Sequence, residues 1–144
     1  MRHSISDMQS LRDCTGVIGR AFPGGRAFTQ MELEHDLRNC TGPNARVQRF
    51  VAYDDKSGRP LSSGGMTLYP ALGFGLLWAG GTIPEARGRG AYAAILGARI
   101  KRARELGFDY VGLYAMVNTS APIVLRHGFR AYGSMTYWER SRSV

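Results

Sequence analysis

The sequence Thr82-Ile83-Pro84-Glu85-Ala86-Arg87-Gly88-Arg89-Gly90-Ala91-Tyr92 joins an apolar run, residues 74–82, to the longest helical pattern of the chain. From residue 92 to residue 106 the apolar side chains recur with helical spacing, which predicts an amphipathic helix of about four turns. A helix N-terminus offers unpaired N–H groups and a partial positive charge, and glycines before it remove the Cβ atoms that would keep an anion away. We therefore expect residues 87–92 to bind an anion.

Two arginines in this segment indicate which anion. Arg87 and Arg89 carry guanidinium groups suited to phosphate oxygens, so pyrophosphate is the natural ligand. A Walker loop is excluded because no Gly-Lys-Ser/Thr sequence is present, and a dinucleotide-binding turn is excluded because a third glycine and the acidic residue after the next strand are missing. The alternative interpretation is a Gly-Arg turn that binds nothing.

The spacing Arg87-x-x-Gly90-x-Tyr92 resembles the acyl-CoA loop of the GNAT superfamily of N-acetyltransferases, which reads Gln/Arg-x-x-Gly-x-Gly/Ala between a strand and a helix. Residues 80–86 resemble the family's approach to this loop. Residues 118–129, with the sequence Asn-Thr-Ser-Ala-Pro-Ile-Val-Leu-Arg-His-Gly-Phe, are similar to its later helix and Gly-Phe turn. The resemblance spans residues 47–139, and it contains two motifs in the family's order.

The resemblance implies an α/β (α+β) fold, with a central mixed and mostly antiparallel sheet flanked by helices, in a single domain of residues 1–144. The residue patterns predict helices at 7–21, 29–39, 92–106 and 118–127, and strands at 46–53, 61–69, 74–82, 110–116 and 129–140. Family members open with a strand, but only residues 1–4 precede the first helix here. We expect this strand to be short, absent or supplied by a partner chain, which leaves room for a homodimer.

Local signals support several of these elements. Thr29 and Glu32 have the spacing of a capping box, and Ser120 is expected to cap the last helix. Glycine pairs at 64–65 and 80–81 interrupt two strand patterns, which is typical of a bulge or of a close ligand. In the GNAT family the pantetheine arm of the cofactor lies there.

Composition limits the other functions. The 144 residues are 44% hydrophobic and 21% charged, as expected of one domain, with no membrane span and no signal sequence, so we expect a cytoplasmic protein. Cys14 and Cys40 lack the spacing of metal ligands or of a disulfide framework, and no metal is expected. A net charge of +8 suits a cofactor that carries phosphates, while the absence of a basic aromatic surface or a helix-turn-helix pattern argues against nucleic acid.

The resemblance implies transfer of an acetyl group from acetyl-CoA, the cosubstrate, to a primary amine of a small molecule or protein, by direct attack in a ternary complex. It assigns the cofactor grip to the loop backbone and the polarisation of the thioester to backbone groups near residues 81–83. The residues expected to bind the cofactor are Gly81, Thr82, Ile83, Arg87, Gly88, Arg89, Gly90, Ala91, Tyr92, Asn118 and Ser120.

Two positions depart from the family pattern. Tyr92 replaces the usual Gly or Ala, and the helical spacing directs its side chain toward the core. Val124 stands where many members have the tyrosine that acts as general acid. Candidates for the acid are therefore Tyr114 and Tyr132, with Ser120 as a weaker third, because a phenol can reprotonate a thiolate.

The general base is not evident, since residues 74–83 contain no carboxylate. We expect the proton of the amine to leave through water toward Glu32, His35 or Tyr69. The alternative function, suggested by Val124, is an acyl-CoA-binding module with weak or no catalysis and a sensor or regulatory role.

Overall fold

The computed structural model describes residues 2–140, with side chains from residue 4 onward. The chain divides after Leu113 into two compact units, and each is described by itself. The single domain expected from the sequence stays a prediction.

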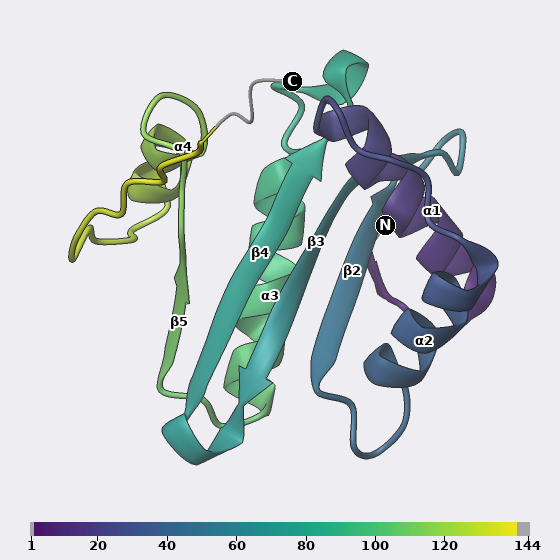
Figure 1. Cartoon of the computed structure of the whole chain (residues 1–144), viewed down its shortest axis with the longest axis horizontal. Helices are drawn as coiled ribbons and strands as arrows, with labels where there is room; N and C mark the ends of the chain where they lie inside the picture. The colour runs from purple at the N-terminus through teal and green to yellow at the C-terminus, as the bar shows by residue number, and fades with distance from the viewer. Residues whose placement is uncertain (1, 141–144) are drawn as a thin grey trace. The chain divides into compact units, whose positions relative to one another are not determined.

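A five-stranded sheet forms the first unit (Figure 1). Its strands follow the order β1-β2-β3-β4-β5. They are β1 (Arg2–Ser4), β2 (Val47–Tyr53), β3 (Pro60–Tyr69), β4 (Phe74–Thr82) and β5 (Tyr110–Leu113). Neighbouring strands are antiparallel except for β4 and β5, which are parallel. The mixed, mostly antiparallel sheet expected from the sequence is confirmed.

Of the two outer strands, β1 has one of the forms expected from the sequence and β5 differs from its expected form. The first strand is present but only three residues long, and it pairs with β2 of its own chain. β5 ends at Leu113 instead of residue 116, and Tyr110 is 73% exposed, so the expectation of a mostly buried strand is wrong. A strand that pairs on one edge only leaves its first residues open to solvent.

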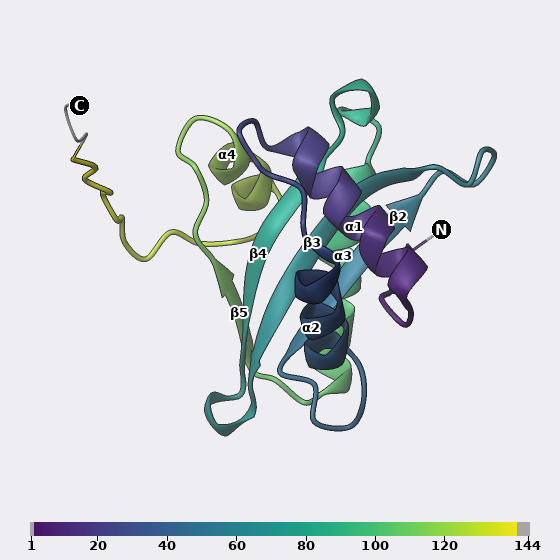
Figure 2. The same ribbon diagram turned by 45° about the vertical axis from the view of Figure 1, so that its right-hand side comes forward.

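Helices cover both faces of the sheet. Figures 1 and 2 show α1 (Met8–Ala21) and α2 (Gln30–Cys40) on one face and α3 (Ala91–Glu105) on the opposite face. Short 3₁₀ turns, η1 (Pro70–Leu72) and η2 (Pro84–Ala86), lie at the start and end of β4. Because α3 connects two parallel neighbours, the unit β4-α3-β5 is a crossover connection.

Capping side chains fix where the first two helices begin. The Asp7 carboxylate accepts a hydrogen bond of 2.8 Å from the Ser10 N–H, and the Ser10 side chain bonds back to the cap residue. At α2, Thr29 and Glu32 form the capping box that their spacing predicts. Each N-cap of this type contributes about 1 kcal/mol to stability.

The strands bury alternate residues on opposite faces, as a pleated sheet requires. Val51 packs with Leu11, Cys14 and Leu33 beneath α1 and α2, whereas the adjacent Phe50 packs with Ile95 of α3. Met31, in contrast, lies on the outer side of α2 and is 77% exposed.

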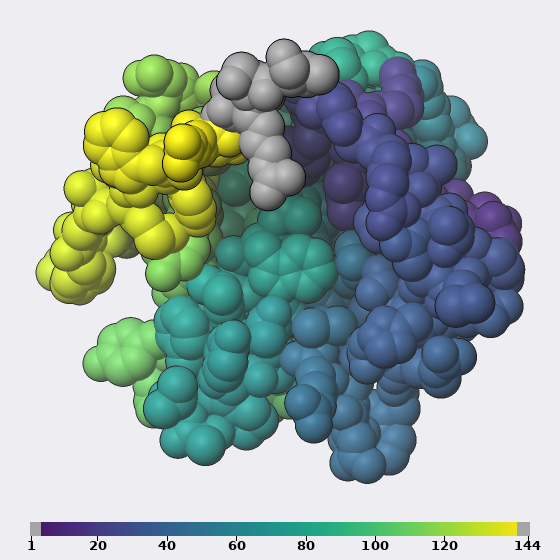
Figure 3. Space-filling model, in the orientation of Figure 1, coloured from purple at the N-terminus to yellow at the C-terminus, as the bar shows by residue number. Residues whose placement is uncertain are grey.

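The helices α1 and α2 cover only part of their face. In Figure 3, side chains of the teal segment, which contains β3, η1 and β4, form surface beside the blue helices. Tyr69 and Leu72 in this segment are 41% and 71% exposed. This open part of the sheet belongs to the strands that lead into the loop before α3.

The second unit contains α4 (Ser120–Arg126), which begins after Thr119. Ser120 is therefore the first helical residue and not the cap, and its hydroxyl accepts a hydrogen bond from the Met116 N–H at 2.9 Å. The expected closing strand at 129–140 is wrong, because the described residues there have no regular secondary structure. Alternating aromatic residues form a strand only where another strand offers its backbone, and Tyr132 and Trp138 are 91% and 92% exposed.

None of the described helices is long and apolar enough to cross a bilayer.

Candidate active site

A bulge interrupts β4 before the loop. Ser63 pairs with Gly81 and Gly65 pairs with Trp78, so two residue steps on β3 face three on β4. Ala79, within the longer segment, has a φ of 49°, which is uncommon for a residue with a side chain. Such backbone geometry is concentrated near functional sites, where it re-aims backbone groups.

The bulge lies where β4 loses its parallel neighbour. β5 pairs with β4 only from Phe74 to Leu77, so within the first unit no strand is paired to the β5 side of residues 78–82. Within the first unit, this edge of β4 therefore has no strand partner, whereas the other edge is paired with β3. The glycines at 64–65 and 80–81 thus mark a bulge, as their position in the sequence predicts.

The loop after β4 leaves the N-terminus of α3 open. Gly90 is the N-cap in the left-handed conformation, with a φ of 82°, and no side chain caps the helix. Gly88 also has a positive φ, of 74°. A Cβ atom on either glycine would have no neighbour within 4 Å, so there is free space in front of the helix.

The N–H groups in this space lack acceptors. The first α3 hydrogen bond across the cap runs from the Ala94 N–H to the Gly90 carbonyl, at 3.0 Å. The amides of residues 88–93 have no acceptor among the residues that the structure describes, whereas the Arg87 amide donates to the Pro84 carbonyl at 3.3 Å. Free amides at a helix N-terminus bind anions, since the helix dipole adds to their charge.

The two loop arginines have different environments. Arg87 turns back to the protein, where its Nε and Nη2 donate to the carbonyls of Thr82 and Ala21, each at 3.4 Å. Arg89 is 60% exposed at its side chain and lies 3.7 Å from a carboxylate oxygen of Asp54. Arg89 is therefore the guanidinium free to reach a phosphate, while Arg87 braces the loop.

Glu85 links this loop to two other segments. Its carboxylate accepts from Arg20 at 2.6 Å and also from Arg59. These hydrogen bonds, with that of Arg20 the stronger influence, lower the pKa of Glu85 to about 2. The carboxylate thus stays ionised, and it ties α1 and the β2–β3 turn to the entrance of α3.

The three residues at the end of β4 are engaged within the fold. The Ile83 N–H donates to the Leu61 carbonyl at 2.9 Å, and Ile83 is 1% exposed. The Thr82 hydroxyl lies 3.0 Å from that of Ser62, and Gly81 packs against Ala21 and Phe22. The Ile83 amide is therefore already bonded within the fold.

Tyr92 points inward from the second residue of α3. A Cβ atom on Gly80 would lie 3.0 Å from Tyr92 Cε2 and 3.4 Å from its hydroxyl oxygen, so the ring lies against the bulge. The side chain is half-buried. Its inward direction agrees with the helical spacing.

Four of the expected site residues belong to the second unit. Tyr114 and Tyr132 are 73% and 91% exposed, and Asn118 is exposed as well. Ser120 is occupied by the Met116 amide. Their roles remain predictions from the sequence.

The candidates for the general base have other partners. Glu32 closes the α2 capping box and also binds Arg26, and these bonds lower the pKa of Glu32 to about 2. So acidic a carboxyl group is a weak proton acceptor at neutral pH. His35 lies 3.0 Å from Asn39, and Tyr69 packs against Phe74.

Arg99, which is not among the residues expected from the sequence, is 1% exposed between α3 and the sheet. A signal was present, since residue 99 lies four positions after Ile95 and seven after Tyr92, on the apolar side of α3. A charged residue in that stripe is unusual, because burying a guanidinium is costly.

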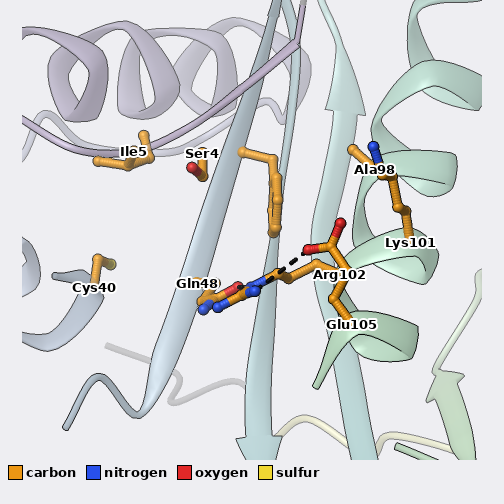
Figure 4. Close-up of a pocket in the computed structure, with 9 residues that line it drawn as sticks. Ser4, Ile5, Cys40, Gln48, Ala98, Lys101, Arg102 and Glu105 are labelled. Carbon is orange, nitrogen blue, oxygen red and sulfur yellow. Dashed lines mark hydrogen bonds and ion pairs between the residues drawn. The ribbon is translucent and has the colours of Figure 1, made fainter. Parts of the chain in front are cut away.

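A separate pocket of about 320 Å³ lies beside the C-terminal half of α3 (Figure 4). It is lined by Ser4, Ile5, Cys40, Gln48, Phe50, Ala98, Lys101, Arg102 and Glu105. Arg102 donates to Gln48 at 3.0 Å and pairs with Glu105 at 3.3 Å. With a rise of about 1.5 Å per residue, the lining residues on α3 are about 10 to 20 Å from the N-terminus of that helix. None of the expected site residues contributes to the pocket.

Both cysteines are free and buried. Burial raises the pKa of Cys14, and it raises that of Cys40 to about 11. Among the described residues, no three His, Cys, Asp or Glu side chains gather as metal ligands would.

Solved structures with this architecture are numerous, although no family model and no curated protein matches the sequence. An acetyltransferase from Trypanosoma brucei is 20% identical, with a TM-score of 0.77 over 97% of this chain and 100% of that one. Glucosamine-6-phosphate N-acetyltransferase from Arabidopsis thaliana is 11% identical, with a TM-score of 0.77 over 98% and 99%. A transcriptional regulator from Bacillus halodurans is 14% identical, with a TM-score of 0.78 over 97% and 99%.

These similarities cover nearly the whole chain at low identity, and further neighbours are N-acetyltransferases as well. The chain has the fold of the GNAT-type N-acetyltransferases.

Proposed function

We propose that this protein is an acetyl-CoA-dependent N-acetyltransferase, which transfers the acetyl group to a primary amine by direct attack in a ternary complex. One observation carries the proposal: the open N-terminus of α3, with unpaired amides at residues 88–93, directly follows a bulged strand. The proposal is supported because the phosphates of a cofactor bind free amides at a helix N-terminus, and a thioester carbonyl needs backbone donors such as a bulged strand can offer.

The residues present fit coenzyme A. The free space at Gly88 and Gly90 admits a diphosphate to the backbone, and Arg89 is exposed beside it. The positive charges of Arg20 and Arg59 lie close by, partly offset by Glu85. When bound, the cofactor would supply the acetyl thioester.

The protein's part in the reaction is to hold the thioester and to move protons. Backbone donors at the bulge would stabilise the oxyanion that forms when the amine attacks, since such donors act strongly where water is excluded. The acceptor proton would leave through water. Tyr114 and Tyr132 are proposed acids from the sequence, with Asn118 and Ser120 as further contacts to the cofactor.

Binding is tested with coenzyme A alone, by calorimetry and thermal unfolding. A ligand at 100 times its Kd stabilises the native state by about 2.7 kcal/mol, which raises the Tm by several degrees. An unchanged Tm at saturating coenzyme A, together with no heat of binding, contradicts the proposal.

Catalysis is tested by release of free thiol from acetyl-CoA against a panel of primary amines, including amino sugars, polyamines and peptides with a free N-terminus. We expect turnover with at least one class. Tight binding of coenzyme A without turnover on any amine would instead favour an acyl-CoA-binding module.

A further inference from the structure

The inference concerns Arg99, whose guanidinium is buried without an acidic partner. Arg99 is 1% exposed, and within the described part of the chain no carboxylate forms an ion pair with it. A buried charge of this kind is tolerated only when its N–H groups are hydrogen-bonded. The bonds that satisfy it therefore show which part of the fold it serves.

Arg99 bonds to the backbone on both strands beside the bulge. Its Nη1 donates to the Gly65 carbonyl at 3.2 Å and to the Trp78 carbonyl at 3.4 Å, and its Nε donates to the Ile95 carbonyl at 3.4 Å. Gly65 and Trp78 are the cross-strand partners immediately before the register shift. Arg99 therefore fastens β3, β4 and α3 together at the point where the register changes.

Two glycines make room for this guanidinium. A Cβ atom on Gly64 would lie 2.9 Å from Arg99 Cζ, and one on Gly80 would lie 3.0 Å from Arg99 Nη2. Real Cβ atoms do not approach other heavy atoms at 2.9 Å, so a side chain at Gly64 would displace Arg99. Each strand therefore lacks a side chain where the charge is placed.

Tyr92 completes the arrangement. The two side chains approach the same backbone position, because a Cβ atom on Gly80 would lie 3.0 Å from Arg99 Nη2 and 3.4 Å from the Tyr92 hydroxyl oxygen. Burial lowers the pKa of Arg99, while Tyr92 raises it, in agreement with this proximity. The ring of Tyr92 lies against Gly80, and the side chain is only half-buried. The phenol of Tyr92 thus lies near the fixed guanidinium of Arg99, at the bulge of β4 that follows the residues paired with β5.

We propose that Tyr92, in place of the sequence-based candidates Tyr114 and Tyr132, is the acid of the acetyl transfer and that Arg99 is its positioning residue; this inference rests on the proposed function. The amine nitrogen bonds to the thioester carbon, the C–S bond breaks, and sulfur takes the bonding electron pair. The Tyr92 hydroxyl gives its proton to sulfur. The phenolate that remains lies beside the Arg99 cation, and it recovers a proton through water from the ammonium that acylation has made acidic.

This assignment accounts for two departures from the family pattern together. Val124 removes the usual tyrosine, and Tyr92 adds one at a position where Gly or Ala is usual. Tyr92 lies in the first turn of the helix proposed to hold the diphosphate, so the binding of the cofactor and the placement of the acid depend on the same helical turn.

The test compares Tyr92→Phe with Tyr110→Phe, a matched control on the exposed start of β5. We expect Tyr92→Phe to lower kcat by about a hundredfold, the lower end of the range for loss of an acid catalyst, and to leave the Kd for coenzyme A within about twofold. Tyr110→Phe should change neither value. Turnover of Tyr92→Phe at the wild-type rate would overturn the inference.

Arg99 is tested by Arg99→Met and Arg99→Lys, with Arg104→Met on the same helix as the control. Arg99→Met should lower kcat about tenfold, and Arg99→Lys should recover part of this loss. The double variant Arg99→Met/Tyr92→Phe should be no slower than Tyr92→Phe alone, because the two residues act as a unit. Equal and additive losses would show a merely structural role and contradict the inference.

A third measurement does not depend on activity. Amide hydrogen exchange at residues 78–81 should become at least about tenfold faster in Arg99→Met or, if that variant does not fold, in Arg99→Lys, and it should not change in Arg104→Met. Unchanged exchange overturns the positioning role. Failure of the proposed function is seen separately, as a wild-type protein that neither binds coenzyme A nor releases thiol.

Discussion

Substitution of Gly90 separates binding of the diphosphate from stability of the fold. Gly90 has a φ of 82°, and a Cβ atom there would meet no atom within 4 Å, so Gly90→Ala and Gly90→Glu begin in open space and share the same backbone strain. That strain is about 1 to 2 kcal/mol. In Gly90→Glu an acidic group at the helix N-terminus offsets about 0.3 to 1 kcal/mol of it. We therefore expect Gly90→Glu to be at least as stable as Gly90→Ala.

Affinity for coenzyme A should change in the opposite sense. The repulsion between a carboxylate and each of two phosphate charges about 5 Å away is about 0.8 kcal/mol in bulk water, and about four times larger at the effective dielectric of a protein surface. Even the bulk-water repulsion, summed over the two phosphates, weakens binding by about fifteenfold, since a factor of ten in affinity is about 1.4 kcal/mol.

Isothermal calorimetry with coenzyme A, together with thermal unfolding, measures both quantities for the two variants. We expect the Tm of each to fall by a few degrees, while only Gly90→Glu loses most of its affinity. If Gly90→Glu binds coenzyme A as tightly as Gly90→Ala, the diphosphate does not lie at the α3 N-terminus and the reasoning is refuted.

Three further outcomes are expected. The pKa values of Glu32 and Glu85 are lowered to about 2, so their ion pairs stabilise the fold above the usual carboxyl pKa of 4.5, and this contribution is lost as the pH falls toward 2. The free energy of unfolding of a Glu32→Gln/Glu85→Gln variant, measured in urea, should therefore approach that of the wild type at pH 2. An equal difference between the two proteins at all pH values would contradict this. Burial and the raised pKa of Cys14 and Cys40 should make a thiol reagent react slowly with the native protein and quickly in denaturant, and fast reaction at pH 7 without denaturant would be inconsistent with it. The Leu11 side chain is 0% exposed, so Leu11→Ala should lower the free energy of unfolding, measured in urea, by about 2 to 5 kcal/mol. A substitution on the surface is expected to lower it by less than about 1 kcal/mol.

Features encoded in short stretches of sequence were predicted from the sequence. The capping residues of α2, the antiparallel strands β2 to β4 and the parallel return at β5 follow from residue types and spacings that act within a few neighbours. The glycine pairs also predicted a bulge, because few other residues suit one. The loop before α3 belongs to this group, since its open helix terminus needs only Gly90 and the absence of a capping side chain.

Other features depend on partners that are distant in the sequence. The inward turn of Arg87 requires the Ala21 carbonyl at the end of α1, and the burial of Arg99 requires two carbonyls on separate strands. The closing strand expected at 129–140 shows the same dependence in reverse, because a strand pattern without a paired backbone stays irregular.

The sequence alone determined the order of the helices and of the strands from β2 to β5, together with the open terminus of α3, since periodicity and glycine placement act locally. Only the tertiary structure decided which arginine is free, which amides are already bonded and where Tyr92 meets Arg99. The physical reason is that hydrogen-bond satisfaction and burial are properties of the folded neighbourhood, which no short stretch of the chain contains.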